Sequence, residues 1–278
     1  MKIKNLILAM ALIFNTSQAL AKDVNILAFD NTENKKSQLP RNFRDLSSLG
    51  INAIASAQFS QKQLREVRKK YPNDKITIID LRRENHGFVN GEAVIWHSVF
   101  EQENRGKKLS EISSEENERL NLLQKDGQVL VSNIVKRDHE NGWYKAIEPQ
   151  IVQVNQVTSE ENLAKKNDFS YQRFLVRDFD VPEDAEFSKM INFIKNLPQD
   201  QKLYVHCAGG KGRTGLFLIL LDISKNAKNS SLKEIYARQH KLGAAKLDDI
   251  SEDESWNKEI AVRRLKMIED FYKSYAAK

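Results

Sequence analysis

Cysteine is almost absent from this sequence, since Cys207 is the only one among 278 residues. One cysteine excludes an intramolecular disulfide, and the histidines and carboxylates show no spacing typical of a metal site. Long apolar runs are also lacking. The apolar stretch 6–14 is too short to cross a bilayer and no later stretch is longer, so we expect no stable membrane insertion.

The N-terminus has the layout of a secretory signal. Lys2 and Lys4 precede the apolar stretch 6–14, and the small residues Ala19 and Ala21 follow it. This order of charge, apolar core and small residues predicts a signal peptide over 1–21 that is cleaved near Ala21. We therefore expect an exported protein, periplasmic or secreted. An uncleaved anchor and a buried first helix are the alternatives.

A strong charge of one sign is missing as well. The net charge is +6, and it falls to +4 when Lys2 and Lys4 leave with the signal peptide. This mild excess suits an anionic substrate, whereas the mixing of basic and acidic residues and the lack of a recognisable motif argue against nucleic acid. A lone thiol in an oxidising compartment is a liability, so its retention points to a function for Cys207.

The apolar pattern alternates between strands and helices. Strands are predicted at 51–55, 76–79, 173–176 and 203–205, and helices at 61–71, 184–196, 216–221, 232–240 and 256–275. This alternation is typical of an α/β fold. Between about 101 and 165 the pattern changes to a charged helix and short β segments, which predicts a small inserted region within one domain over 22–278.

A glycine-rich turn around Cys207 joins the strand at 203–205 to the apolar helix. The glycines allow successive backbone N–H groups to point inward at a helix N-terminus, where they hold an anion and stabilise a thiolate. Arg213 presents a planar fork for two phosphoryl oxygens, and Thr214 has a hydroxyl to donate to the sulfur. The alternative is a small buried cysteine in an ordinary strand-to-helix turn.

Two further polar segments accompany this turn. Asp178 and Asp180 lie between a strand and a helix just upstream, and either carboxyl group is a candidate for the general acid that the leaving oxygen needs. A dense polar loop also follows the strand at 76–79. It contains Asp80, Arg82 and His86, which are too close to an apolar strand to be idle surface residues.

The pattern Cys-x5-Arg-Thr, preceded by His206, resembles the signature loop of the cysteine-dependent phosphatases. The segment 80–91, Asp-Leu-Arg-Arg-Glu-Asn-His-Gly-Phe-Val-Asn-Gly, resembles the protein-tyrosine-phosphatase-like phytases of bacteria, which act on inositol phosphates. The segments 42–44, 56–60, 238–240 and 267–275 resemble the same family. Matching pieces therefore run from about residue 40 to the C-terminus.

The resemblance implies a central, mostly parallel sheet flanked by helices and a role for each matching residue. Cys207 matches the nucleophile, Arg213 the phosphate-binding arginine and Thr214 the hydroxyl that supports the thiolate. Asp178 matches the general acid, since it lies four residues before Pro182. Residues of the loop would bind the phosphate through their backbone, namely Ala208, Gly209, Gly210, Lys211 and Gly212.

The resemblance leaves other residues with more than one role. Asp80, Arg82, Glu84 and His86 either bind substrate or hold the active-site loops in place, and His206 is expected to orient its loop. Rough alignment makes Arg44 and Lys246 candidates for distal phosphates of the substrate. No cofactor and no metal is implied.

Two positions depart from the family pattern and bear on the substrate. Phe179 stands where many relatives have a histidine that contacts phosphate, and Lys211 stands where some phytases are apolar and phosphoinositide phosphatases have a lysine. The expected substrate is an inositol polyphosphate such as phytate. The alternatives are a secreted phosphoinositide or phosphotyrosine phosphatase, and a phosphate-binding module without activity. The sequence predicts no oligomeric state.

Overall fold

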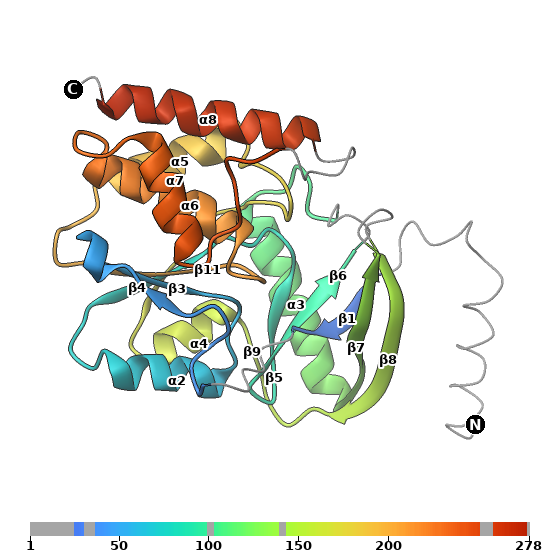
Figure 1. Ribbon diagram of the computed structural model, residues 1–278. Coiled ribbons are helices and arrows are strands. Elements are labelled where there is room, and N and C mark those ends of the chain that lie inside the picture. Colours follow the sequence, from blue (N-terminus) through green and yellow to red (C-terminus); the bar gives the residue numbers. More distant parts are fainter. Residues whose placement is uncertain (1–24, 31–36, 99–102, 139–142, 251–257, 277–278) are drawn as a thin grey trace.

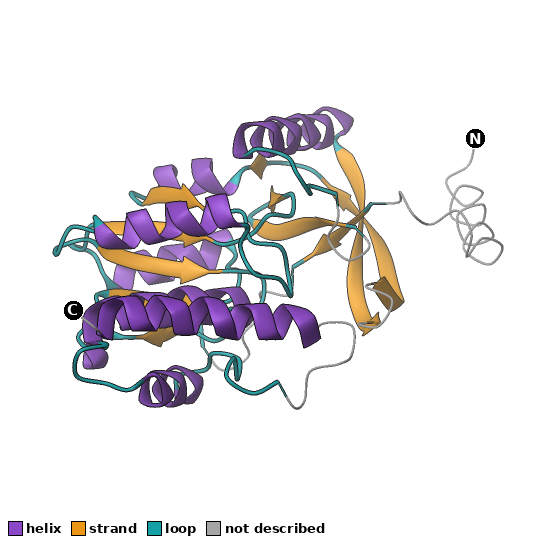
Figure 2. Cartoon of the chain, turned by 90° about the horizontal axis from the view of Figure 1, so that it is seen from above, coloured by secondary structure: helices purple, strands orange, loops and turns teal. Residues whose placement is uncertain are grey.

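The computed structural model describes residues 25–30, 37–98, 103–138, 143–250 and 258–276. The predicted signal peptide, 1–21, lies outside them. Within these ranges the chain builds two sheets that lie side by side, with helices packed on both (Figures 1 and 2). No helix in the described ranges is both long and apolar enough to cross a membrane.

The first sheet has five strands and confirms the α/β prediction. Its order is β10 (Ser170–Arg173), β4 (Ile76–Asp80), β11 (Lys202–His206), β3 (Ala53–Ser56) and β2 (Arg44–Asp45). Neighbours are parallel from β10 to β3, and only β2 runs antiparallel to its neighbour. Because the strands are parallel, the carboxyl ends of β4, β10 and β11 meet at one edge of the sheet, where polar segments follow.

Helices cover both faces of this sheet, as a parallel sheet requires. One face packs against α5 (Asp184–Lys195), α6 (Gly212–Asn226), α7 (Leu232–Lys241) and α8 (Lys258–Ala276) (Figure 1). The other face packs against α2 (Gln61–Lys70) and α4 (Glu160–Lys166). Serine side chains cap the N-termini of α2, α4 and α7, since Ser60, Ser159 and Ser231 each accept a backbone N–H three residues on.

The second sheet has six strands and lies beside the first. Its order is β8 (Trp143–Gln153), β7 (Gln128–Asp138), β1 (Ile26–Phe29), β6 (Glu92–His97), β5 (His86–Val89) and β9 (Val157–Thr158). Leu120 of α3 (Leu109–Asp126) packs into its apolar cluster. The predicted insertion at 101–165 contributes α3, β7, β8 and β9, but β1, β5 and β6 come from before it, so both parts of the chain build this sheet.

One predicted strand is displaced in the structure. Residues 173–176 were expected to form a strand because they are apolar, whereas β10 spans Ser170–Arg173 and ends where that segment begins. Phe174 N donates to Asp80 O at 2.8 Å, and the chain then leaves the sheet. Phe174 and Val176 are apolar because they pack in the core with α6, not because they pair in the sheet.

Candidate active site

The turn around Cys207 connects β11 to α6 at the carboxyl edge of the first sheet. Gly210 has a φ of 68°, and its N–H donates to Cys207 Sγ at 3.2 Å. A Cβ atom on Gly210 would collide with the backbone of Ser56 and Ala57, so this position requires glycine. The turn therefore brings backbone N–H groups and the N-terminus of α6 to the sulfur, as the sequence predicts.

Cys207 lies at the bottom of a cleft and is only 3% exposed. Thr214, in the first turn of α6, is fully buried, and within the described structure its Oγ1 has no hydrogen-bond partner. A buried hydroxyl without a partner is costly. This hydroxyl is thus a donor available to a thiolate or to a bound anion.

Arg213 is fixed by acceptors on two sides. Its Nη1 and Nη2 donate to the two carboxylate oxygens of Glu84 at 2.7 and 3.1 Å, and Nη1 also donates to Val176 O at 3.1 Å. Burial opposes ionisation of Glu84, but Arg213 and Arg82 outweigh it and hold the pKa of Glu84 well below its usual range. The Nε atom of Arg213 has no partner among the described residues, so this donor is free for a phosphoryl oxygen.

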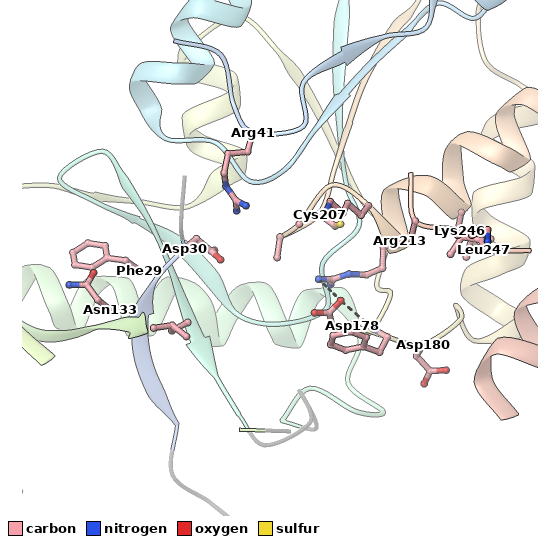
Figure 3. A pocket seen from close by; sticks show the side chains of 18 of the residues that line it. Phe29, Asp30, Arg41, Asn133, Asp178, Asp180, Cys207, Arg213, Lys246 and Leu247 are labelled. Atoms are coloured by element: carbon pink, nitrogen blue, oxygen red, sulfur yellow. Dashed lines mark hydrogen bonds and ion pairs between the residues drawn. The ribbon is translucent and has the colours of Figure 1, made fainter. Parts of the chain in front are cut away.

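The structure separates the two candidate acids. Both side chains line the cleft, but only Asp178 is paired with Arg213 in the described structure, its Oδ1 lying 3.3 Å from Arg213 Nη2. Asp180 is held by two ion pairs, with Arg177 Nη2 at 2.6 Å and with Arg263 Nη2 of α8 at 2.8 Å. Figure 3 shows Asp178 beside Arg213 and near Cys207, with Asp180 pointing away. The geometry favours Asp178 as the proton donor.

The cleft has a volume of about 1110 Å³ and is walled by both sheets (Figure 3). Phe29 of β1 and Asn133 of β7 form one wall, and Lys246 lines the opposite side. Phe179 is 48% exposed in the cleft and has a φ of 60°, a conformation that is strained for an aromatic residue. Cationic side chains in the lining belong to Arg41, Lys211, Arg213, Lys246 and Arg264.

Asp80, Arg82 and His86, expected either to bind substrate or to hold the loops, lie behind the turn and not in the cleft. Each is at most 1% exposed. Arg82 donates from Nε to Glu84 at 2.8 Å and from Nη1 to Asp30 at 2.7 Å. Since Glu84 in turn holds Arg213, the geometry supports a scaffolding role for these residues and places them out of reach of a substrate in the cleft.

Arg44 does not line the cleft either. It is 6% exposed, and its Nη1 donates to Asn42 O at 3.1 Å. Arg44 was expected to reach distal phosphates of the substrate, but its side chain is buried in the sheet and is not part of the cleft lining. Lys246 does line the cleft and pairs with Asp249 at 2.8 Å.

Glu160 is a site residue that the sequence does not reveal. It begins α4, is 1% exposed, and its Oε1 lies 2.6 Å from His206 Nε2, directly before Cys207. Its Oε2 accepts from Gln58 Nε2 at 2.8 Å and lies 3.4 Å from His86 Nε2. Burial opposes the charge on Glu160, but His206 outweighs it and lowers the pKa of Glu160 to about 2.

Asp80, Glu160 and His206 lie close enough together to hold a cation. Protein groups already occupy this position. Asp80 Oδ2 accepts from Tyr171 at 2.7 Å and lies 3.1 Å from Arg173 Nε. Burial disfavours a charge on His86, yet Asp80 and Glu116 contribute to raising its pKa to about 10. Arg173 and His86 therefore supply the positive charge that a metal ion would bring.

Comparisons with known proteins, by sequence and by structure, identify the same family. The family model of PTP-like phytases, described with inositol hexakisphosphate, matches residues 79–225, a stretch that contains the segment 80–91, Asp178 and the whole turn from Cys207 to Thr214.

Solved structures of the same kind resemble the fold. A PTP-like myo-inositol phosphatase from Mitsuokella multacida, in complex with myo-inositol-(1,3,4,5)-tetrakisphosphate, is 30% identical with a TM-score of 0.79, covering 90% of this chain and 45% of that one. A PTP-like phytase from Bdellovibrio bacteriovorus is 26% identical with a TM-score of 0.73, covering 94% of this chain and 92% of that one.

A curated relative is the effector protein hopD2 from Pseudomonas syringae pv. tomato. It is 25% identical over 257 residues, which make up 88% of this chain and 53% of that protein. The chain thus spans about half the length of this relative and of the Mitsuokella structure.

Proposed function

This chain belongs to the PTP-like phytase family, and from that premise we propose that it is a cysteine-dependent phosphatase of myo-inositol polyphosphates. One observation carries the proposal. Cys207, Arg213 and Asp178 meet at the bottom of one cleft whose lining adds further cationic side chains. The cleft volume, about 1110 Å³, is above the roughly 300–1,000 Å³ of ordinary small-ligand pockets, which suits a ring that carries several phosphates.

The first step forms a phosphocysteine. The thiolate of Cys207 attacks phosphorus in line, while Arg213 and the backbone N–H groups of the turn hold the equatorial oxygens. The bond between phosphorus and the inositol oxygen breaks, and Asp178 protonates the departing oxygen. The helix N-terminus and Arg213 stabilise the charge on the phosphoryl oxygens. Because the fold already holds both groups in position, no reorganisation is needed during the reaction.

The second step releases phosphate. Asp178, now ionised, accepts a proton from a water molecule that attacks phosphorus from the side the inositol has left. The bond between sulfur and phosphorus breaks, and the electron pair returns to Cys207 as a thiolate. Thr214 Oγ1 is buried and has no hydrogen-bond partner among the described residues, so it can donate to that sulfur and make the sulfur a better leaving group.

We also propose that the protein acts outside the cytoplasm. Lys2 and Lys4, the apolar stretch 6–14 and Ala21 support a cleaved signal peptide, and the solitary Cys207 suits a compartment in which spare thiols oxidise. Phytate and its partly dephosphorylated forms are the proposed substrates.

Phosphate release from three compounds tests the proposal: inositol hexakisphosphate, a soluble phosphoinositide and a phosphotyrosine peptide. We expect the highest kcat/KM with inositol hexakisphosphate, and a preference for the peptide would overturn the substrate assignment. The Cys207→Ser variant serves as the matched control. It should lose all measurable hydrolysis of each compound and keep the circular dichroism spectrum of the parent, and activity equal to the parent would exclude the phosphocysteine step.

A further inference from the structure

Arg44 of β2 is a buried cation without an ion-pair partner in the described structure. It is 6% exposed, and its Nη1 donates a hydrogen bond to Asn42 O at 3.1 Å. Its Nε and Nη2 atoms are buried and have no partner among the described residues. Burying an unpaired charge is costly, so a nearby negative group is needed to offset the cost.

The register of the sheet places Cys207, the candidate negative group, on the same side of the sheet as Arg44. Arg44 pairs with Ala55 of β3, and Ala55 pairs with Val205 of β11. Residues that pair across a sheet point to the same face, so Arg44 and Val205 share one face. Cys207 follows Val205 by two residues and belongs to the same core cluster as Ala55 and Val205. Two strand spacings are about 10 Å, a gap that an arginine side chain largely crosses.

The segment that carries Arg44 is also attached to the turn. Asn42 Nδ2 donates to Gly209 O at 2.8 Å, and Asn42 is the residue whose carbonyl receives Nη1 of Arg44. Asn42 adopts this position with a φ of 54°, which asparagine tolerates better than most residues. Arg44 is therefore held in a constant position relative to the sulfur.

A negative charge on Cys207 favours the charged form of Arg44. Burial lowers the pKa of the Arg44 guanidinium to about 10, and a negative Cys207 acts against that loss. Arg213 differs, because its charge is already matched by Glu84 and Asp178. Arg44 is thus the buried positive charge near the sulfur that lacks a carboxylate partner in the described ranges, whereas Lys211 of the turn is exposed to solvent.

We propose that Arg44 is a positioning residue whose buried charge stabilises the thiolate of Cys207 from behind the turn and does not contact the substrate. The inference rests on the proposed function only in taking Cys207 as the nucleophile. It assigns to Arg44 an effect on the ionisation of the sulfur, which is separable from substrate binding.

Alkylation of Cys207 by iodoacetamide at a series of pH values tests this directly. The reaction reports a single thiol, since the chain has no other cysteine. We expect Arg44→Met to move the midpoint of alkylation upward by about one pH unit, which lowers the alkylation rate below the midpoint about tenfold. Arg44→Lys should keep most of the original midpoint. Arg65→Met, which removes an exposed arginine from α2, should leave it unchanged.

Enzyme kinetics distinguish an effect of Arg44 on the sulfur from a direct contact of Arg44 with substrate. If Arg44 contacts a substrate phosphate instead, Arg44→Met raises KM and leaves the alkylation midpoint where it was, and this overturns the proposal. If Arg44→Met does not fold, Arg44→Gln takes its place with the same expected shift, since its amide can still donate to Asn42 O. The alkylation needs no substrate, so a protein that fails to hydrolyse inositol hexakisphosphate would refute the proposed function and leave this test intact.

Discussion

The two sides of the turn around Cys207 differ in what their charged groups contact, although the rear side also has buried polar atoms without a hydrogen-bond partner in the described ranges, such as Arg82 Nη2 and His206 Nδ1. On the cleft side, Arg213 Nε and Thr214 Oγ1 are buried donors that have no partner within the described ranges. Behind the turn, Asp80 and Glu160 accept hydrogen bonds from protein groups, and Arg173 and His86 lie among them. The cleft side keeps donors available for a phosphate, whereas the rear side holds the turn in shape.

This difference separates chemistry from stability. A substitution of Asp178, which is 31% exposed on the cleft side, removes a group that acts on the substrate and leaves the folded state nearly as stable as before. A substitution on the rear side leaves a buried charge without its partner, which destabilises the fold. The two sides should therefore respond to mutation in opposite ways, and the following experiments measure this.

The largest effect is expected on the cleft side, from Asp178→Asn. An amide has the shape of the acid but no proton to transfer, so kcat for inositol hexakisphosphate should fall about 10²–10⁴-fold while the Tm changes little. The loss should be much smaller with an aryl phosphate whose phenolate leaves without a proton. The prediction is checked by measuring kcat with the two substrates and Tm by thermal unfolding.

Asp180→Asn is the matched control for this prediction. It changes the same chemical group two residues away, but Asp180 is engaged by Arg177 and Arg263. We expect kcat within about tenfold of the parent, because the ion pairs only help to hold the loop. A larger loss in Asp180→Asn than in Asp178→Asn would show that the acid had been assigned to the wrong residue.

A smaller effect, and one on stability, is expected behind the turn from Glu160→Gln. The glutamine keeps the shape but leaves His206 and His86 without the carboxylate that lies 2.6 and 3.4 Å away. Breaking a buried pair costs about 3 kcal/mol or more, which is roughly 6–12 °C in Tm for a domain of this size.

Glu161→Gln is the control for Glu160→Gln. Glu161 is the next residue, and it makes an exposed ion pair with Lys165 at 2.7 Å. An exposed pair of this kind contributes about 0.5 kcal/mol at most, so the Tm should remain within about 2 °C of the parent. Equal losses in the two variants would mean that the rear network does not stabilise the fold as its burial suggests.

The sequence predicts the cleft side better than the rear side. Cys207, Arg213 and Thr214 lie within one turn, so their spacing already determines that they meet. The residues alone leave Asp178 and Asp180 as alternative acids, and the family resemblance favours Asp178 through its spacing to Pro182. The ion pairs of Asp180 with Arg177 and with Arg263, which comes from a distant helix, support that choice.

Buried charges are harder to anticipate, because a charged residue in a sequence normally indicates surface. Arg82 and His86 were therefore open to a binding role, and nothing local in the sequence connects Glu160 to His206, 46 residues away. The wall formed by Phe29 and Asn133 likewise could not be predicted from the sequence, since it depends on how the two sheets pack. The strand expected at 173–176 fails for a related reason, because burial outside a sheet gives the same apolar pattern as burial within one.

The smallest effect is a dependence of stability on pH that originates in the rear network. The pKa of His86 is about 10 in the folded protein against an ordinary 6.5, so folding favours its protonated form. Its contribution is complete below about pH 6.5 and is lost as the pH rises toward 10. Glu160 acts in the opposite direction, since its pKa falls from 4.5 to about 2 and its contribution is lost as the pH falls through that range. Stability should therefore be greatest between about pH 4.5 and 6.5.

Thermal unfolding at pH 6.5 and pH 8 measures how much His86 contributes to the pH dependence of stability. We expect the parent to lose on the order of 1 kcal/mol over this interval, about 2–4 °C in Tm. His86→Gln should have a lower Tm at pH 6.5 and a nearly flat profile above it, because the group that releases the proton is gone. His240→Gln, which removes an exposed histidine of α7, should keep the slope of the parent. A slope that survives in His86→Gln would place the titrating group elsewhere, and the rear side would then owe its stability to hydrogen bonds and not to the charge on His86.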